Sequence, residues 1–140
     1  MTLGKTKFET ELQVRPDDLD MNRHVHASRY QDYVLAARYD QMARCYKMSM
    51  EEFQQAGLGW YVKVAHVEYK RALVLGDTFT VRTWVESISG SEIRVGFEIY
   101  RKVTPRPKLA CDGWFDYTLV NLESGRAESI PDEVLRKYSV

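Results

Sequence analysis

The feature that most constrains the fold is one long helix with apolar residues on two sides. Residues 28–46 contain no Gly or Pro, and the Ser28 hydroxyl is suited to cap the first turn. At helical spacing, one face carries Tyr30, Tyr33, Val34 and Ala37, and a second carries Leu35, Tyr39, Met42 and Tyr46. A sheet could approach closely at Ala36, Ala37 and Ala43. The pattern predicts a helix enclosed by the rest of the chain.

The remaining periodic segments indicate a sheet. Residues 7–15, 60–69, 78–87, 92–103 and 109–122 alternate as half-buried strands do. Within 60–69 the alternation predicts one face with Tyr61, Lys63, Ala65, Val67 and Tyr69. Turn residues separate the later strands at hairpin spacing, which favours antiparallel pairing.

Two short helices complete the expected order. Residues 49–55 begin with Ser49 and carry Glu52 three positions later, which forms a capping box. The second short helix, 131–138, opens at Pro131. The order predicts a single α+β domain over residues 1–140, with an antiparallel β-sheet wrapped around one long central α-helix.

Composition narrows the class of protein. Twenty basic and twenty acidic residues cancel, so no long-range field recruits nucleic acid or a membrane surface. No run approaches the roughly 20 apolar residues that span a bilayer, and the N-terminus lacks the apolar segment of a signal peptide. Cys45 and Cys111 have no metal-binding or redox spacing, which favours reduced thiols. We expect a cytoplasmic protein.

A polar loop before the long helix concentrates the titratable groups. Asp17 and Asp18 follow Pro16 directly and are typical turn residues. His24 and His26 lack a third ligand at recognisable spacing, so no metal site is expected. Burial would raise the pKa of a carboxylate beside the helix, and the helix dipole would lower it. The sequence does not decide between these two effects.

Three segments carry a resemblance to a known family. They are VRPDDLDMNRHVHASRYQDYVLAAR, VEYKRALVLGDTFTV and VNLESGRAESIPDEV. In order and spacing they resemble the hotdog-fold thioesterases, specifically the 4-hydroxybenzoyl-CoA and long-chain acyl-CoA thioesterase branch. The resemblance implies a hotdog fold and hydrolysis of an acyl-CoA thioester to free acid and CoA.

The resemblance also implies catalytic residues. The family's loop aspartate precedes a helix tyrosine by ten residues, as Asp20 precedes Tyr30 here. Asp20 would be the nucleophile or the general base, and backbone amides around His26 and Ala27 would hold the oxyanion. His24 matches the histidine of the family's HVNN run, but His26 and Ala27 occupy the two asparagine positions.

Substrate-binding residues follow from the same resemblance. Lys70 and Arg71 would contact the phosphates of coenzyme A, which is part of the substrate, and no further cofactor is expected. Four cations in or beside residues 104–108 could serve equally: Arg101, Lys102, Arg106 and Lys108. The acyl pocket is expected between the central helix and the helix of a neighbouring subunit, with Tyr30, Tyr33, Trp60 and Tyr61 as its aromatic residues. Edge-to-edge pairing of sheets would give a homodimer or a dimer of dimers, that is, a homotetramer.

Two other functions remain open at this point. The run DMNRHV also resembles the start of acyl-carrier-protein thioesterases, although those place Asn, His and Cys on a second hotdog repeat that 140 residues do not hold. A non-catalytic acyl-binding module is the other alternative. In that case Asp20→Ala would still bind acyl-CoA and would have no activity to lose.

Overall fold

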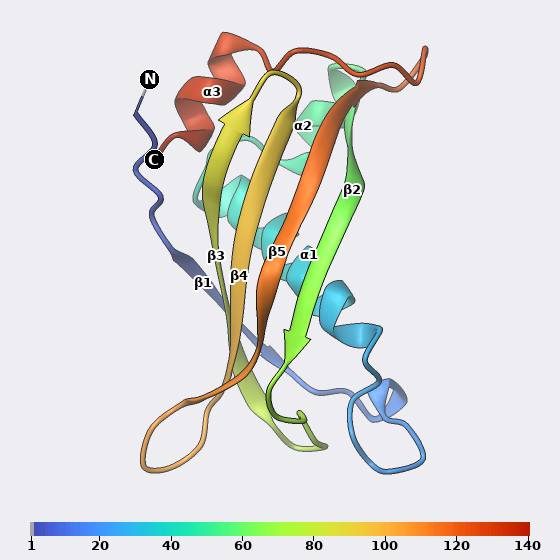
Figure 1. Ribbon diagram of the computed structural model, residues 1–140, viewed down its shortest axis with the longest axis vertical. Helices are drawn as coiled ribbons and strands as arrows, with labels where there is room; N and C mark the ends of the chain where they lie inside the picture. Colours follow the sequence, from blue (N-terminus) through green and yellow to red (C-terminus); the bar gives the residue numbers. More distant parts are fainter. Residues whose placement is uncertain (1) are drawn as a thin grey trace.

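The computed structural model describes residues 2–140 and contains one antiparallel sheet with a long helix, α1 (Arg29–Arg44), packed on one of its faces (Figure 1). The strands are β1 (Phe8–Gln13), β2 (Leu58–Tyr69), β3 (Thr78–Ser89), β4 (Glu92–Arg101) and β5 (Lys108–Asn121). The short elements are a 3-10 helix at Pro16–Asp18, α2 (Met50–Gln55) and α3 (Asp132–Tyr138). The predicted order of elements is confirmed.

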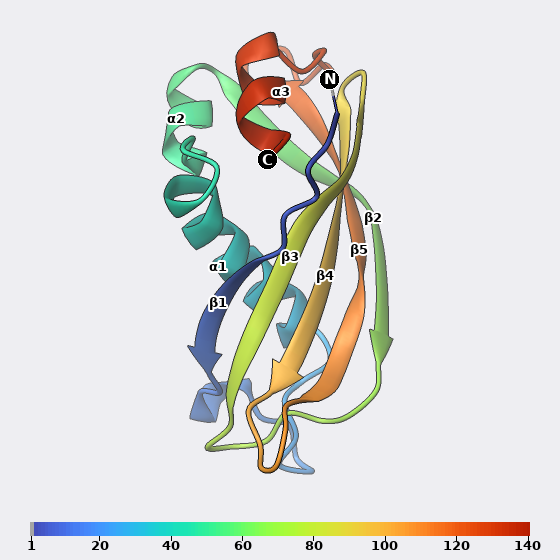
Figure 2. The same ribbon diagram turned by 90° about the vertical axis from the view of Figure 1, so that its left-hand side faces the viewer.

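The sheet order is β1-β3-β4-β5-β2 with every neighbouring pair antiparallel. Consecutive hairpins join β3, β4 and β5, while β1 and β2 form the two edges. Because α1 lies between β1 and β2 in the chain, it crosses the sheet diagonally from one edge to the other (Figures 1 and 2). This is the α+β hotdog arrangement that the sequence predicted.

The core lies between α1 and the inner face of the sheet. Val34 and Ala37 have no exposed surface, and they pack in one cluster with Phe79, Val81 and Phe97 from β3 and β4. Fully burying one such aliphatic or aromatic side chain contributes about 1.5–3 kcal/mol. This packing fixes α1, and therefore the loop before it, relative to the sheet.

The second apolar face of α1 is enclosed only in its later half: Met42 and Tyr46 are buried as the sequence predicted, whereas the part nearer the start of the helix is not. Leu35 and Tyr39 are about half exposed, at 51% and 49%, and Ala36 and Ala43 are exposed. The sheet curls around only one side of the helix, so these residues border an open side. Ser28 likewise makes no side-chain capping bond, because its own backbone is already helical.

The sequence predicted that Tyr61 and Ala65 lie on the same face of β2. This prediction is wrong, because the strand contains a bulge between Val62 and Val64 that shifts the alternation by one residue. Val62 pairs with Tyr117, and Ala65 pairs with Phe115, whose ring is buried in the core. Residues opposite each other share a face. Trp60 and Val62 therefore lie on the inner face with Ala65, whereas Tyr61 does not.

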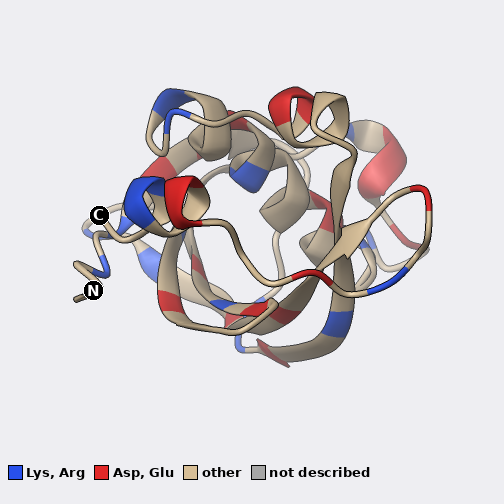
Figure 3. Ribbon diagram, turned by 90° about the horizontal axis from the view of Figure 1, so that it is seen from above, with Lys and Arg blue, Asp and Glu red and all other residues tan. Residues whose placement is uncertain are grey.

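Charges are dispersed over the outside of the molecule. Figure 3 shows acidic and basic residues interspersed on helices, strands and loops, in agreement with the zero net charge. Cys45 and Cys111 are both free thiols. Within residues 2–140, no helix has the length and apolar character needed to cross a membrane.

Candidate active site

The loop before α1 is anchored by Asp18. Its side chain is buried and accepts a hydrogen bond from the Tyr33 hydroxyl at 2.6 Å and one from the Arg15 amide at 3.2 Å. The Arg29 guanidinium lies 3.6 Å from the other carboxylate oxygen. Asp18 therefore ties the loop to the first turns of α1, as a structural turn residue.

Asp20 has a different environment two residues later. Its Oδ1 accepts the amides of Asn22 at 2.8 Å and His24 at 3.1 Å, and its own amide donates to the His24 carbonyl at 2.7 Å. These bonds close a tight turn in which Arg23 has a positive φ of 64°. The His24 amide bond lowers the pKa of Asp20 from 3.8, against the smaller opposing effect of burial. Asp20 is thus a carboxylate at neutral pH.

Most of the predicted site residues line one surface depression of about 290 Å³. These are Asp20, His24, Ala27, Tyr30, Lys70 and Arg71, joined by Val25, Tyr69 and Ala72. We call this the N-terminal depression, because it lies where the loop enters α1. It collects residues from the loop, from the start of α1 and from the end of β2.

The other predicted residues lie elsewhere. The His26 amide donates to the Asp18 carbonyl at 2.8 Å, so it is already occupied. Tyr33 points to Asp18 and packs on Phe79 with ring centroids 4.6 Å apart. Trp60 and Tyr61 belong to the other end of β2, and Tyr61 is 57% exposed.

The Ala27 peptide is the backbone element best placed for an oxyanion. Among residues 2–140, no acceptor takes the Ala27 amide hydrogen, and Ala27 lines the N-terminal depression. The Ala27 carbonyl accepts the Tyr69 hydroxyl at 2.8 Å, which holds the chain at the helix start. An unpaired N–H group at a helix N-terminus is suited to bind negative charge.

Tyr69 is the site residue that the sequence did not reveal. It is the last residue of β2, and its ring packs edge-on against Tyr30 at 5.2 Å. Tyr30 is buried, and its hydroxyl accepts the Leu73 amide at 2.9 Å. The only sequence signal for Tyr69 was its place beside Lys70, at the end of a strand.

The two basic residues are held by the backbone. The amides of Lys70 and Arg71 both donate to the Ala110 carbonyl, at 2.8 and 3.0 Å. The Arg71 guanidinium also donates to the Leu109 carbonyl at 3.2 Å, and the Lys70 ammonium lies 3.4 Å from exposed Glu68. Both side chains therefore stay near the rim of the depression, where they add positive charge.

A second, apolar cavity of about 190 Å³ lies under the middle of α1. It is lined by Leu35, Arg38, Met42, Met50, Trp60, Val62, Ile93, Val95, Tyr117 and Tyr138. We call it the mid-helix cavity. It holds Trp60, and its only charged residue is Arg38. Neither hollow contains a metal site, since no group of three His, Cys, Asp or Glu residues within 2–140 could hold an ion.

The fold and the site together define a class of protein. A hotdog domain with a carboxylate, a free helix amide and basic residues around one depression is suited to hydrolysis of an acyl compound. The family model of the thioesterase-like superfamily matches residues 14–138. The chain belongs to this superfamily, and it is a thioester hydrolase.

Individual relatives agree with this assignment. The chain is similar to the long-chain acyl-CoA thioesterase FadM of Escherichia coli, with 22% identity over 130 residues, 93% of this chain and 96% of FadM. The DHNA-CoA thioesterase of Staphylococcus aureus superimposes with a TM-score of 0.87 at 20% identity, covering 95% of this chain and 89% of that one. A 4-hydroxybenzoyl-CoA thioesterase gives 0.84 at 13% identity, covering 95% and 99%. The predicted membership of the hotdog-fold thioesterases is confirmed.

Proposed function

We propose that the protein hydrolyses an acyl-CoA thioester at the N-terminal depression, with Asp20 as nucleophile or general base. The observation that carries this proposal is that Asp20, the Ala27 amide and the Lys70-Arg71 pair line a single hollow. FadM, the similar E. coli protein, is named as a long-chain acyl-CoA thioesterase. An acyl-CoA thioester would give each of these groups a role in binding or hydrolysis.

Asp20 has the correct charge state and a free oxygen. Within residues 2–140, both hydrogen bonds to its side chain go to Oδ1, so Oδ2 remains available. As general base, Asp20 would take a proton from water while the water oxygen attacks the thioester carbonyl. As nucleophile, Oδ2 would form an acyl-enzyme that water then hydrolyses. In both routes the C–S bond breaks and CoA leaves as the thiolate.

The Ala27 amide would stabilise the tetrahedral intermediate. The negative charge develops on the former carbonyl oxygen, and a preorganised N–H donor at that position contributes about 2.7–4 kcal/mol in comparable sites. The His26 amide, the other donor expected from the sequence, would first have to leave the Asp18 carbonyl. Ala27 is therefore the donor that we assign.

Lys70 and Arg71 would hold the phosphates of CoA at the rim. Both side chains are exposed, and their backbone amides fix the chain on the Ala110 carbonyl. His24 and Tyr30 would border the thioester, His24 through its place beside Asp20 and Tyr30 through its ring at the base of the hollow. In this arrangement CoA remains outside and the acyl group enters the protein.

We also propose that the active form is a homodimer, or a dimer of dimers. β2 is an edge strand, and Tyr61, Val62 and Val64 on it are 57%, 57% and 43% exposed. An exposed apolar edge is a template for pairing with a second chain. Light scattering of wild type and Val64→Lys tests this: wild type should be oligomeric and the variant should dissociate. A monomeric wild type would contradict it.

Thiol release from a panel of thioesters tests the proposed function. The panel contains short aliphatic, palmitoyl, benzoyl and 4-hydroxybenzoyl esters of CoA, with matched acyl-carrier-protein esters. We expect release from at least one CoA ester, and tight binding without release for Asp20→Ala. A preference for carrier-protein esters would favour that alternative. Binding of acyl-CoA without hydrolysis by wild type would favour a non-catalytic module.

A further inference from the structure

Arg38 is a buried cation that the proposed chemistry does not use. It lies in the third turn of α1 with only 6% of its surface exposed, and it lines the mid-helix cavity. A guanidinium stays protonated at any pH at which the protein is folded. A full positive charge is therefore held in an otherwise apolar cavity.

The charge of Arg38 has no counter-ion. None of the ion pairs among residues 2–140 includes Arg38. Its hydrogen bond from Nη1 to the Thr83 hydroxyl is long at 3.4 Å, and its guanidinium carbon lies 5.2 Å from the Tyr46 ring centroid. Neither partner carries a negative charge.

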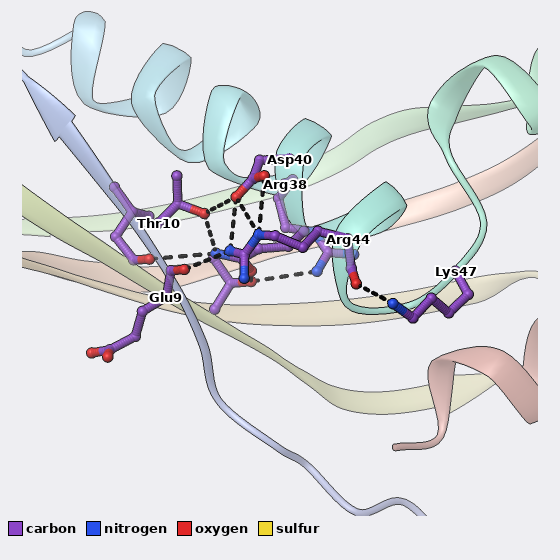
Figure 4. Close-up of polar contacts among 9 residues, drawn as sticks. Glu9, Thr10, Arg38, Asp40, Arg44 and Lys47 are labelled. Atoms are coloured by element: carbon purple, nitrogen blue, oxygen red, sulfur yellow. Dashed lines mark hydrogen bonds and ion pairs between the residues drawn. The ribbon is translucent and has the colours of Figure 1, made fainter.

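Arg44 on the same helix shows what a satisfied arginine looks like here. It donates to both oxygens of Asp40, at 2.8–3.3 Å, and to the Glu9 carbonyl at 2.8 Å (Figure 4). Arg44 is exposed, so it needs these partners less than Arg38 does. A buried charge left without its partner costs several kcal/mol. Arg38 is thus poised for an anion that enters the cavity.

The mid-helix cavity has the size and lining of an acyl site. Its volume, about 190 Å³, exceeds the roughly 150 Å³ of an apolar cavity that accepts benzene. Leu35, Met42, Trp60 and Val62 supply apolar walls, and no acidic residue lines it. A chain with an apolar body and an anionic end would match both the walls and the guanidinium.

The two hollows lie along the same helix. Ala27 lies two residues before α1, and Arg38 is nine positions after Arg29, the first residue of α1, which corresponds to about 14 Å along the helix axis. Between the two hollows, the open side of α1 faces β2. Leu35 on α1 is half exposed there, and Ala65 on the inner face of β2 is exposed. A thioester at Ala27 could therefore extend its chain toward Arg38.

We propose that the acyl group of the substrate ends in a carboxylate, which forms a bidentate ion pair with Arg38. The substrate class is then the CoA monothioester of a medium-chain dicarboxylic acid. This inference rests on the proposed function, because the same acyl-CoA must reach Asp20. A planar guanidinium matches a carboxylate in geometry as well as in charge.

Hydrolysis of matched substrate pairs tests the inference. Sebacyl-CoA and decanoyl-CoA differ only in the terminal group, and succinyl-CoA and butyryl-CoA form a pair too short to reach Arg38. In wild type we expect kcat/KM to favour sebacyl-CoA over decanoyl-CoA by tenfold or more, with no such preference in the short pair. Arg38→Met should invert the long-chain preference, and Arg38→Lys should restore part of it. Arg44→Met is the matched control and should leave every ratio unchanged.

Thermal unfolding separates this role from a structural one. Arg38→Met removes an unpaired buried charge, so its Tm should equal or exceed that of wild type. Free sebacate should raise the Tm of wild type and not that of Arg38→Met, which tests the site even if no thioester is hydrolysed. Equal rates on both long-chain esters would overturn the inference and leave the proposed function intact. A large Tm loss in Arg38→Met with no effect of sebacate would assign Arg38 a structural role and also overturn it.

Discussion

The two hollows along α1 differ in how they are built. The N-terminal depression is open and polar, and its working groups are an ionised carboxylate and a backbone amide. The mid-helix cavity is apolar, and its one charged group is a buried side chain. A backbone N–H group can bind the carbonyl oxygen of any thioester, whereas an apolar wall with a single cation favours acyl chains of one shape and charge. In the proposed mechanism, bond cleavage and substrate choice would therefore take place at different positions along one helix.

The largest effect is expected when the carboxylate of the depression is neutralised. Asp20→Asn keeps an oxygen that accepts the Asn22 and His24 amides, so the loop should hold its shape. Loss of the base or nucleophile should lower kcat by about 10²–10⁴-fold, measured by thiol release. Asp17→Asn is the matched control, because exposed Asp17 bonds only to Arg15 and lies outside the depression. Similar rates for both variants would contradict the assignment.

Protonation of the Asp20 carboxylate in wild type should lower activity as the Asp20→Asn substitution does. Because the loop amides lower the pKa of Asp20 from its ordinary value of 3.8, protonation of the carboxylate requires a pH below that ordinary value. As the pH is lowered from 7, kcat/KM should therefore stay constant until Asp20 begins to be protonated. Circular dichroism at each pH checks that the protein remains folded. A midpoint near pH 6 with the fold intact would indicate another group as the base.

Removing the hydrogen bond by which Asp18 anchors the loop to α1 should lower stability more than activity. Tyr33→Phe deletes the buried hydrogen bond to the Asp18 carboxylate, and bonds to charged groups contribute about 1.5–3 kcal/mol. Urea unfolding should show a loss of this size. The control is Tyr39→Phe on the exposed side of α1, whose free energy of unfolding should decrease less. If Tyr33→Phe lowered kcat as strongly as Asp20→Asn, Asp18 would belong to the reaction.

A smaller effect is expected from the residue that positions the Ala27 peptide. Tyr69→Phe removes the 2.8 Å hydrogen bond to the Ala27 carbonyl, a net loss of about 0.5–1.5 kcal/mol. This corresponds to roughly two- to twelvefold in kcat, with KM little changed. Tyr61→Phe, at an exposed position of the same strand, should behave as wild type. Equal kcat for both variants would show that Ala27 is held without Tyr69.

The smallest effect is expected at the rim. Arg71→Ala removes an exposed cation, and exposed ion pairs contribute about 0.2–1 kcal/mol, so KM should rise by about five-fold at most. The increase should shrink at high salt, while kcat stays unchanged. Lys108→Ala, an exposed cation outside the depression, should leave KM as it was. A salt-independent loss of kcat would instead place Arg71 at the reacting bond.

The sequence predicted those parts of the fold that depend on local periodicity. The order of helices and strands and the inward face of Tyr30, Val34 and Ala37 are found in the structure. On the second face of α1, Met42 and Tyr46 are buried as predicted, but Leu35 and Tyr39 are not, because periodicity shows that they are apolar but not how far the other elements cover the helix. The faces of β2 were mispredicted because a single bulge at Val62/Val64 reverses the alternation, and no residue type announces it.

The candidate site was predictable where a local motif carries it. Asp20 and Ala27 belong to one continuous loop, and Lys70 and Arg71 adjoin a strand end, so the resemblance was enough to select them. The parts that depend on packing were not predictable. The Tyr69 hydroxyl reaches a carbonyl 42 residues away in sequence. Whether an arginine in a helix pairs, as Arg44 does, or stays buried and unpaired depends on neighbours from other elements.

A crystal structure of Asp20→Asn with a non-hydrolysable sebacyl-CoA analogue would test the division between the two hollows most directly. We predict that the carbonyl oxygen lies about 2.7–3.1 Å from the Ala27 amide, with the acyl chain along the open side of α1 and its carboxylate on Arg38. An acyl chain that leaves the Ala27 amide free, or that turns away from the mid-helix cavity, would contradict it.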